Sequence, residues 1–214
     1  MSQQFESMSE MVISGEVEGV KTLVEEALAS GASAQEVLRT GLLPGMDVVG
    51  EQFKIGEMYI PEVLMSARAM AGAMELLKPL LTDSEMAGAG TVVIGTVEGD
   101  IHNIGKDLVA MLLEGAGFKV INLGIDVTPG AFVKAAIEHD ADIIAMSALL
   151  TTTMPRMKTT VDALREAGLG EKVMIIAGGA PVNEEYVKNI GGHAYAPDAA
   201  VAVEKARALM ARRA

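Results

Sequence analysis

The sequence contains no cysteine and no tryptophan, and aromatic residues make up only 3% of its 214 residues. Without cysteine the chain can form no disulfide bond, no zinc–thiolate site and no thiol nucleophile. No uninterrupted apolar run approaches the ~18 residues that a membrane-spanning helix requires. Residues 1–6 carry neither the basic head nor the apolar stretch of a signal peptide. We therefore expect a soluble, cytoplasmic protein that binds no membrane.

The composition is acidic and rich in methionine. The chain has 29 Asp and Glu residues against 17 Lys and Arg residues, which gives a formal net charge of −12. An acidic surface repels the phosphates of nucleic acids, so we expect no DNA or RNA partner. The 15 methionines predict a core in which these flexible side chains fill irregular spaces.

Apolar residues recur at helical spacing from the N-terminus to about Leu81. The capping pair Ser33 and Glu36 predicts the start of a helix that should end near Phe53. Pro61 fits the first turn of the next helix. The apolar residues behind it follow alternating steps of four and three, at Val63, Ala67, Met70, Met74 and Leu77. This spacing is typical of the seam of a helix bundle, so we expect a small four-helix bundle.

Small residues at 83–90 predict a linker, and the periodicity changes after them. Five buried strands are predicted, at 91–97, 119–123, 141–146, 173–177 and near Ala194. Helices are predicted to follow each strand, at 106–115, 129–138, 157–167, 184–189 and from Ala199 onward. This alternation favours a flavodoxin-like (Rossmann-like) α/β domain with a five-stranded parallel sheet. The expected organisation is a helical cap over 1–85, a linker over 86–90 and the α/β domain over 91–214.

Ligands of parallel sheets bind beyond the carboxyl ends of the strands, where the strand order reverses. In the strand order 2-1-3-4-5 the loops to inspect are residues 98–105, 147–153 and 178–181. The first loop lacks the glycine spacing of a dinucleotide site, and no Walker sequence is present. A phospho-acceptor domain would need an aspartate at position 147, where this chain has Ser147. A dinucleotide site, a Walker-type nucleotide site and a phospho-acceptor domain are therefore excluded.

The first loop offers a histidine beside a carboxylate. A neutral imidazole such as that of His102 is a good ligand for transition metals. Its second ring nitrogen then needs a hydrogen-bond acceptor, which Asp100 could provide, and Thr153 could extend the relay. The chain's other histidines are His139 and His193. A bound metal would therefore take its remaining ligands from a macrocycle, although an Asp-x-His loop is more often an ordinary polar turn.

The three loops together resemble the cobalamin-binding domain of methionine synthase and related corrinoid proteins. That family is marked by Asp-x-His-x-x-Gly, Ser-x-Leu and Gly-Gly, matched here by residues 100–105, 147–149 and 178–179. Each motif follows a predicted strand in the expected order. Residues 53–63 are similar to the signature of the helical cap that precedes this domain. The resemblance covers nearly the whole chain.

The resemblance implies a corrinoid cofactor, in the methylcobalamin or hydroxocobalamin form, with His102 as the lower axial ligand of its cobalt. Asp100 and Thr153 would complete the relay, with threonine where the family often has serine. Ser147 would contact the base of the buried nucleotide tail. The residues expected to leave room for this tail are Leu149, Gly178 and Gly179. Further loop residues expected at the cofactor are Asn103, Ile104, Gly105, Thr151 and Ala180, with Tyr195 beside the tail.

The cap would shield the upper, methyl-bearing face of the corrinoid. The resemblance assigns this role to Phe53, Ile60 and Val63, but Val63 fits the ordinary core of a bundle equally well. His139 and His193 are expected on the surface, with His193 near the tail groove.

With 214 residues the chain has no room for the other domains of methionine synthase, and it is similar to the small corrinoid proteins of three-component methyltransferase systems. Such a protein, not catalytic alone, would accept a methyl group on Co(I) from a substrate:corrinoid methyltransferase. It would donate that group from methyl-Co(III) to a methylcorrinoid:acceptor methyltransferase that serves a folate-type carrier or coenzyme M. A reductive activating protein would be a third partner. These systems use methylamines, methanol, methoxylated aromatics or betaines in methanogenesis or one-carbon metabolism.

Two other functions fit parts of the sequence. A corrinoid-dependent sensor or regulator would ordinarily carry an effector or DNA-binding segment. The small subunit of an adenosylcobalamin mutase resembles the α/β half alone, so the helical cap argues against it. The methyl donor is not encoded in these residues, because substrate chemistry belongs to a partner.

Overall fold

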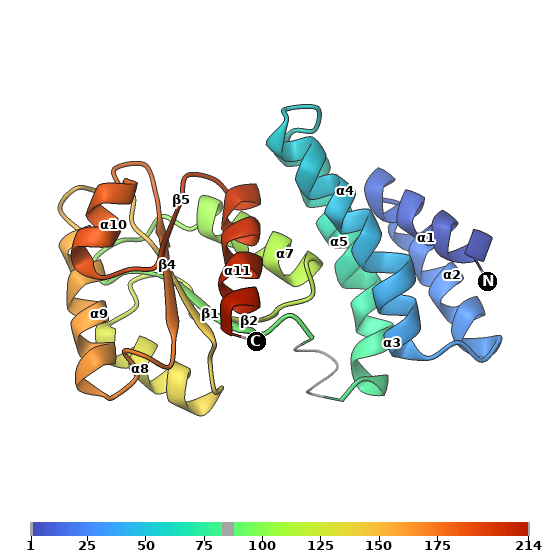
Figure 1. The fold of residues 1–214 in the computed structure, drawn as a ribbon. Helices are drawn as coiled ribbons and strands as arrows, with labels where there is room; N and C mark the ends of the chain where they lie inside the picture. The colour runs from blue at the N-terminus through green and yellow to red at the C-terminus, as the bar shows by residue number, and fades with distance from the viewer. Residues whose placement is uncertain (1, 83–87, 214) are drawn as a thin grey trace. The chain divides into compact units, whose positions relative to one another are not determined.

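The computed structural model describes residues 2–82 and 88–213. The chain divides into two compact units, one formed mainly by residues before Ala89 and the other mainly by residues after it. The first is a bundle of helices and the second contains a sheet covered by helices (Figure 1). Of the expected linker, residues 83–87 lie outside the described residues, and the domain limits given above stay a prediction.

The helical unit contains long helices that pack against one another. Its elements are α1 (Ser2–Ser14), α2 (Val17–Ala29), α3 (Ala34–Glu36), η1 (Val37–Leu42), α4 (Leu43–Lys54), α5 (Ile60–Leu77) and η2 (Lys78–Leu80). The Ser33 hydroxyl accepts the Glu36 N–H at 3.1 Å, so the predicted cap is present. Pro61 lies in the first turn of α5, also as predicted. Four of the five seam residues are buried and Met74 is half-buried.

One local feature of this unit was not predicted. η1 is a π-helical turn, in which the Leu43 N–H donates to the carbonyl of Leu38, five residues earlier. The wider turn lies directly before Pro44, which has no N–H to donate and whose ring crowds the preceding turn. Nearby, a Cβ on Gly45 would lie 2.8 Å from the Ser9 carbonyl oxygen. The glycine therefore allows α4 to pack closely on α1.

The second unit is a doubly wound sheet. Its elements are β1 (Thr91–Thr96), α7 (Ile104–Gly115), β2 (Lys119–Asn122), α8 (Pro129–Glu138), β3 (Ile143–Ser147), α9 (Pro155–Glu166), β4 (Met174–Gly178), α10 (Glu184–Ile190), β5 (Ala194–Ala196) and α11 (Ala199–Arg213). All strand pairs are parallel, in the order β2-β1-β3-β4-β5. The predicted fold class and strand order are therefore confirmed.

Helices cover both faces of this sheet. α7 and α11 lie on one face, and α8, α9 and α10 lie on the other (Figure 1). All six residues of β1 are buried, as expected for a central strand covered on both sides. α7 begins two residues earlier than predicted, because the Asp107 N–H already donates to the Asn103 carbonyl at 2.7 Å. None of the helices within the described ranges is long and apolar enough to span a membrane.

The register brings the ends of three strands level. Thr96 at the end of β1 pairs with Ser147 at the end of β3, and Ser147 pairs with Gly178 at the end of β4. The loops that follow these strands therefore emerge from one edge of the sheet. This is the edge at which the sequence predicted the ligand.

Candidate functional site

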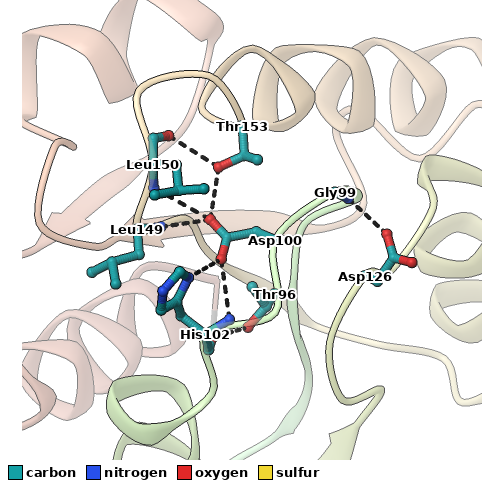
Figure 2. A network of polar contacts seen from close by, with 8 residues as sticks. All are labelled: Thr96, Gly99, Asp100, His102, Asp126, Leu149, Leu150 and Thr153. Atoms are coloured by element: carbon teal, nitrogen blue, oxygen red, sulfur yellow. Dashed lines mark hydrogen bonds and ion pairs between the residues drawn. The ribbon is translucent and has the colours of Figure 1, made fainter.

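A buried carboxylate holds the exposed histidine of the first loop. Asp100 has no exposed surface, and its Oδ1 accepts the His102 backbone N–H at 3.1 Å. The same oxygen lies 2.8 Å from Nδ1 of the His102 ring, which is 46% exposed (Figure 2). An ionised carboxylate can only accept a hydrogen bond, so in the neutral imidazole Nδ1 carries the ring proton and Nε2 keeps its lone pair. The imidazole is thereby fixed in the tautomer that a metal ligand needs.

The second oxygen of Asp100 joins the first loop to the loop after β3. Oδ2 accepts hydrogen bonds from the backbone N–H groups of Leu149 at 2.8 Å and Leu150 at 3.3 Å. It also accepts the hydroxyl of buried Thr153 at 2.7 Å. The sequence-predicted relay residues His102, Asp100 and Thr153 are thus brought together. Figure 2 shows the network drawn around this one carboxylate.

These contacts also fix the charge of Asp100. Burial alone would raise the pKa of this carboxyl group. Hydrogen bonds from Thr153, from His102 and from the loop backbone outweigh that effect and hold the pKa well below its usual range. Asp100 is therefore ionised at neutral pH, and its charge favours a proton on the side of the imidazole that faces it.

Two further residues support the first loop, and sequence reasoning did not identify them. The hydroxyl of Thr96, buried at the end of β1, donates to the His102 carbonyl at 2.9 Å. Asp126, in the loop after β2, accepts the Gly99 N–H through Oδ1 at 2.7 Å (Figure 2). The sequence could have indicated them only by position: Thr96 is the last residue of β1, and Asp126 lies in the loop that follows the carboxyl end of β2.

Large apolar side chains are exposed around the imidazole. Ile101, Ile104, Leu149 and Leu150 lie on the two loops and are between 41% and 79% exposed. Apolar residues gathered in the loops around a polar group are typical of a ligand site. A Cβ added at Gly105 would meet nothing within 4 Å, so space beside the imidazole loop is open. A ligand with apolar surface beside the imidazole fits this arrangement.

The glycine pair after β4 has a structural requirement of its own. A Cβ on Gly178 would lie 2.5 Å from the Ala196 carbonyl oxygen, and one on Gly179 would overlap the Ala148 carbonyl oxygen. Gly179 also has a φ of +127°, which side chains rarely adopt. The fold therefore needs both glycines even without a ligand, and their role in making room for a tail stays a prediction.

The other expected site residues lie on the same loops or near them. Asn103, Thr151 and Ala180 are exposed, while Ser147 and Tyr195 are half-buried. In the helical unit Phe53 is half-buried and Ile60 is exposed, whereas Val63 is fully buried in the bundle. The burial of Val63 supports the ordinary core role for that residue. The assignment of these residues to the cofactor stays a prediction.

The remaining histidines have structural surroundings. His139 is half-buried at the C-terminal end of α8. His193 precedes β5 and is exposed, as expected, and its Nδ1 accepts the Ile175 N–H at 2.9 Å, near the start of β4. Among the described residues no group of three or more His, Asp or Glu side chains could hold a metal ion. A metal at His102 would therefore bring its other ligands with it.

The sheet, the outward imidazole and the apolar loops define a class of protein that binds a metal held within a large, apolar macrocycle. Two segments of the chain, residues 90–206 and 4–78, match models of the B12 binding domain. The chain therefore belongs to the family of B12-binding proteins. Its cofactor is cobalamin or a related corrinoid, which contains cobalt.

Relatives that share most of the chain carry more specific names. The trimethylamine corrinoid protein 1 of Methanosarcina acetivorans is 46% identical over 190 residues, which is 88% of each chain. The dimethylamine corrinoid protein 1 of the same organism is 41% identical over 201 residues, or 94% of each chain. A crystal structure of the methanol:cobalamin methyltransferase complex from Methanosarcina barkeri matches with a TM-score of 0.89 and 31% identity. That match covers 98% of this chain and 80% of the other.

Proposed function

We propose that this chain is the methyl-carrying corrinoid protein of a methyltransferase system, in which Nε2 of His102 would bind the cobalt. When bound, the corrinoid supplies a cobalt centre that can take up and release a methyl group. The observation that carries the proposal is the 2.8 Å contact between Asp100 Oδ1 and His102 Nδ1, on a ring that is 46% exposed. The names of the relatives that share 41% and 46% identity with the chain support it.

The residues of the chain have separate tasks in this function. Asp100 holds the ring proton on Nδ1 of His102 and so keeps the lone pair of Nε2 for the metal. Thr153 and the backbone of the second loop hold Asp100 in its ionised form by hydrogen bonds. Ile104 and Leu149 offer exposed apolar surface to the macrocycle. The open space beside Gly105 and the polar side chains of Ser147, Asn103 and Thr151 would receive the nucleotide tail.

Methyltransferases are the partners that the comparisons support. We propose a substrate:corrinoid methyltransferase as the methyl donor and a methylcorrinoid:acceptor methyltransferase, serving a folate-type carrier or coenzyme M, as the recipient. A reductive activating protein would restore oxidised cofactor. The relatives named for methylamines are 41% and 46% identical, against 31% for the methanol complex. A methylated amine is therefore the donor that we propose.

A sensor or a mutase subunit has less support. The helical unit matches a B12-binding model over residues 4–78, whereas a mutase subunit would resemble the α/β unit alone. Carriage of a methyl group accounts for both units of the chain. No described feature specifically favours the alternatives.

The test is methyl transfer to the full chain loaded with hydroxocobalamin and reduced chemically. Purified trimethylamine:, dimethylamine: and methanol:corrinoid methyltransferases would each be added with their substrates, and the visible spectrum of the cofactor followed. We expect a methylated spectrum with an amine and its methyltransferase. Methylation with methanol alone would overturn the proposed donor. Corrinoid binding without methylation by any of the three would overturn the carrier function.

A further inference from the structure

Residues Asn122–Val127, which run from the last residue of β2 into the loop after it, contact the His102 loop at both of its ends. We infer that this segment, here called the β2 strap, positions His102 and that Asp126 is its principal positioning residue. Neither the loop motifs nor the B12-binding match assigns a role to the strap. The inference rests on the proposed function, because it concerns how His102 is presented to the corrinoid.

Asp126 holds the start of the loop by two reciprocal hydrogen bonds. Its Oδ1 accepts the Gly99 N–H at 2.7 Å (Figure 2). Its own backbone N–H donates to the Asp100 carbonyl at 3.0 Å. These bonds fix the backbone on both sides of the Gly99–Asp100 peptide. The direction of the Asp100 side chain, and with it the His102 ring, depends on that peptide.

The backbone of Asp126 supports a specific role. Its φ of +53° lies in the left-handed region, where glycine is the usual residue and aspartate is tolerated better than most. Among the described residues other than glycine, Asp140 is the second with a positive φ, at +47°. Asp140 lies in the turn between α8 and β3, at the opposite edge of the sheet. It therefore offers a matched control with the same residue type and backbone conformation.

The strap also holds the end of the loop. Lys106, in the first turn of α7, is buried and donates through Nζ to Asn122 Oδ1 at 2.7 Å and to Asp107. Asn122 Oδ1 also accepts the Gly124 N–H at 3.0 Å. A buried ammonium group is strongly unfavourable without such partners, so this contact must be maintained in the folded chain.

The strap is in turn attached to the sheet. The Gly124 carbonyl accepts the Thr96 N–H at 3.0 Å, and the Val127 N–H donates to the Thr96 carbonyl at 2.9 Å. Thr96 is the residue whose hydroxyl binds the His102 carbonyl. Asp126 thus restrains the loop before His102 and Asn122 restrains it after His102. Gly124 and Val127, which lie between and beside them, bond to the end of β1.

The experiment compares Asp126→Gly, Asp126→Asn and Asp140→Gly in the full chain. Asp126→Gly removes the acceptor of the Gly99 N–H, but glycine adopts the positive φ of this position without strain. Asp126→Asn keeps a side-chain oxygen that can accept the Gly99 N–H. Three properties would be measured, of which the first two are hydrogen exchange of the Gly99 amide without cofactor and the affinity for cobalamin. The third is the nitrogen splitting of the cob(II)alamin electron paramagnetic resonance signal in 15N-labelled protein, where a histidine nitrogen on cobalt gives a doublet and the base of the cofactor itself gives a triplet.

In Asp126→Gly we expect the amide hydrogen of Gly99 to exchange faster. The variant should bind cobalamin about 10-fold more weakly and show less nitrogen splitting than the wild-type protein. Asp126→Asn should restore all three properties to nearly wild-type values, and Asp140→Gly should leave them unchanged. If Asp126→Gly does not fold, Lys106→Met breaks the other end of the loop and should give the same losses of affinity and splitting.

Wild-type affinity and splitting in Asp126→Gly, or in Lys106→Met where that variant is needed, would overturn the inference. Equal losses in Asp140→Gly would also overturn it, because the effect would then be one of general stability. Absence of nitrogen splitting in the wild-type protein would instead contradict the proposed ligation by His102. The failure of the inference and that of the proposed function are therefore distinguishable.

Discussion

Two histidines of the α/β unit, at opposite edges of the same sheet, have opposite hydrogen bonds. At the carboxyl edge, Nδ1 of His102 faces the Asp100 carboxylate at 2.8 Å. Toward the amino edge, Nδ1 of His193 accepts the Ile175 N–H at 2.9 Å. His102 therefore keeps its lone pair on Nε2, whereas the lone pair of His193 is already used by the backbone. His102 is therefore suited to bind a metal because its Nδ1 faces a carboxylate, whereas Nδ1 of His193 faces a backbone N–H.

The two edges also differ in which group has a shifted pKa. Burial, followed by the nearby positive charge of Arg165, lowers the pKa of His193, so its neutral form is favoured by the loss of solvent. At the other edge it is Asp100 that is held in one charge state, by hydrogen bonds to its ionised form. The carboxyl edge therefore holds a fixed negative charge beside its imidazole, whereas His193, although exposed, has only its neutral form favoured.

The largest effect that we predict at the carboxyl edge is that of Gly179→Ala. The added Cβ would overlap the Ala148 carbonyl oxygen at a φ of +127°. We expect the free energy of unfolding without cofactor to fall by about 4 kcal/mol or more, measured by urea denaturation. Gly105→Ala is the matched control, because the added Cβ would meet no atom within 4 Å. Gly105 lies in α7, where alanine is favoured over glycine, so the free energy of unfolding should stay level or rise by up to about 1 kcal/mol.

The same pair of variants separates folding from binding. Gly105→Ala should bind cobalamin more weakly, because its methyl group enters the open space beside the imidazole loop. Full affinity in this variant would contradict the use of that space by the cofactor. Normal stability in Gly179→Ala would contradict the close backbone approach at the glycine pair.

Asp100→Ala should have the next largest effect. It leaves the N–H groups of Leu149 and Leu150 without their buried acceptor, and the Thr153 hydroxyl keeps the Leu150 carbonyl alone. We therefore expect a loss of about 3 kcal/mol in the free energy of unfolding. Cobalamin affinity should fall about 10- to 100-fold, because His102 loses the partner that orients it. Calorimetric titration and urea denaturation check the two values.

A surface aspartate provides the comparison for this variant. Asp162 forms an exposed ion pair with Lys158, and Asp162→Ala should change stability by less than about 0.5 kcal/mol. Equal effects of the two substitutions would show that Asp100 has no special place in the loop network.

The smallest effect that we predict is a pH dependence from the amino edge. Because the pKa of His193 is lower in the folded chain, the unfolded chain binds more protons just below its ordinary pKa of about 6.5. The stabilising effect of the neutral ring is thus complete above that pH and is lost as pH falls toward the folded pKa. Unfolding free energies measured from pH 7.5 to 5 should decrease accordingly.

His193→Asn should reduce this slope. The asparagine oxygen can accept the Ile175 N–H at any pH in this range, and asparagine does not titrate. An unchanged slope in the variant would assign the pH dependence to other groups.

Much of the fold and the centre of the site could be predicted from the sequence. Alternating periodicities identified the strands and helices, and a parallel sheet places all strand ends at one edge. The positions of Asp100, His102 and Thr153 followed from that rule together with the family motifs. Their hydrogen-bond distances did not, because these depend on the register between β1 and β3.

Other features depend on tertiary contacts that no local pattern shows. Asp126 and Thr96 belong to no motif, and Asp126 matters through a backbone group 27 residues away along the chain, while Thr96 matters through the folded shape of the loop that follows it. The pattern indicated glycine at 178 and 179, but the reason is the approach of neighbouring carbonyl groups. The π-helical turn before Pro44 likewise depends on how one helix continues through a proline.

The most direct test of the central claim is the visible spectrum of the chain loaded with hydroxocobalamin, recorded beside His102→Ala and His193→Ala. We predict a protein-bound corrinoid spectrum that shifts in His102→Ala and stays unchanged in His193→Ala, because His102 alone of the two presents a lone pair beside a carboxylate-bound Nδ1. Identical spectra for the wild-type protein and His102→Ala would contradict ligation by His102 and the account built on it.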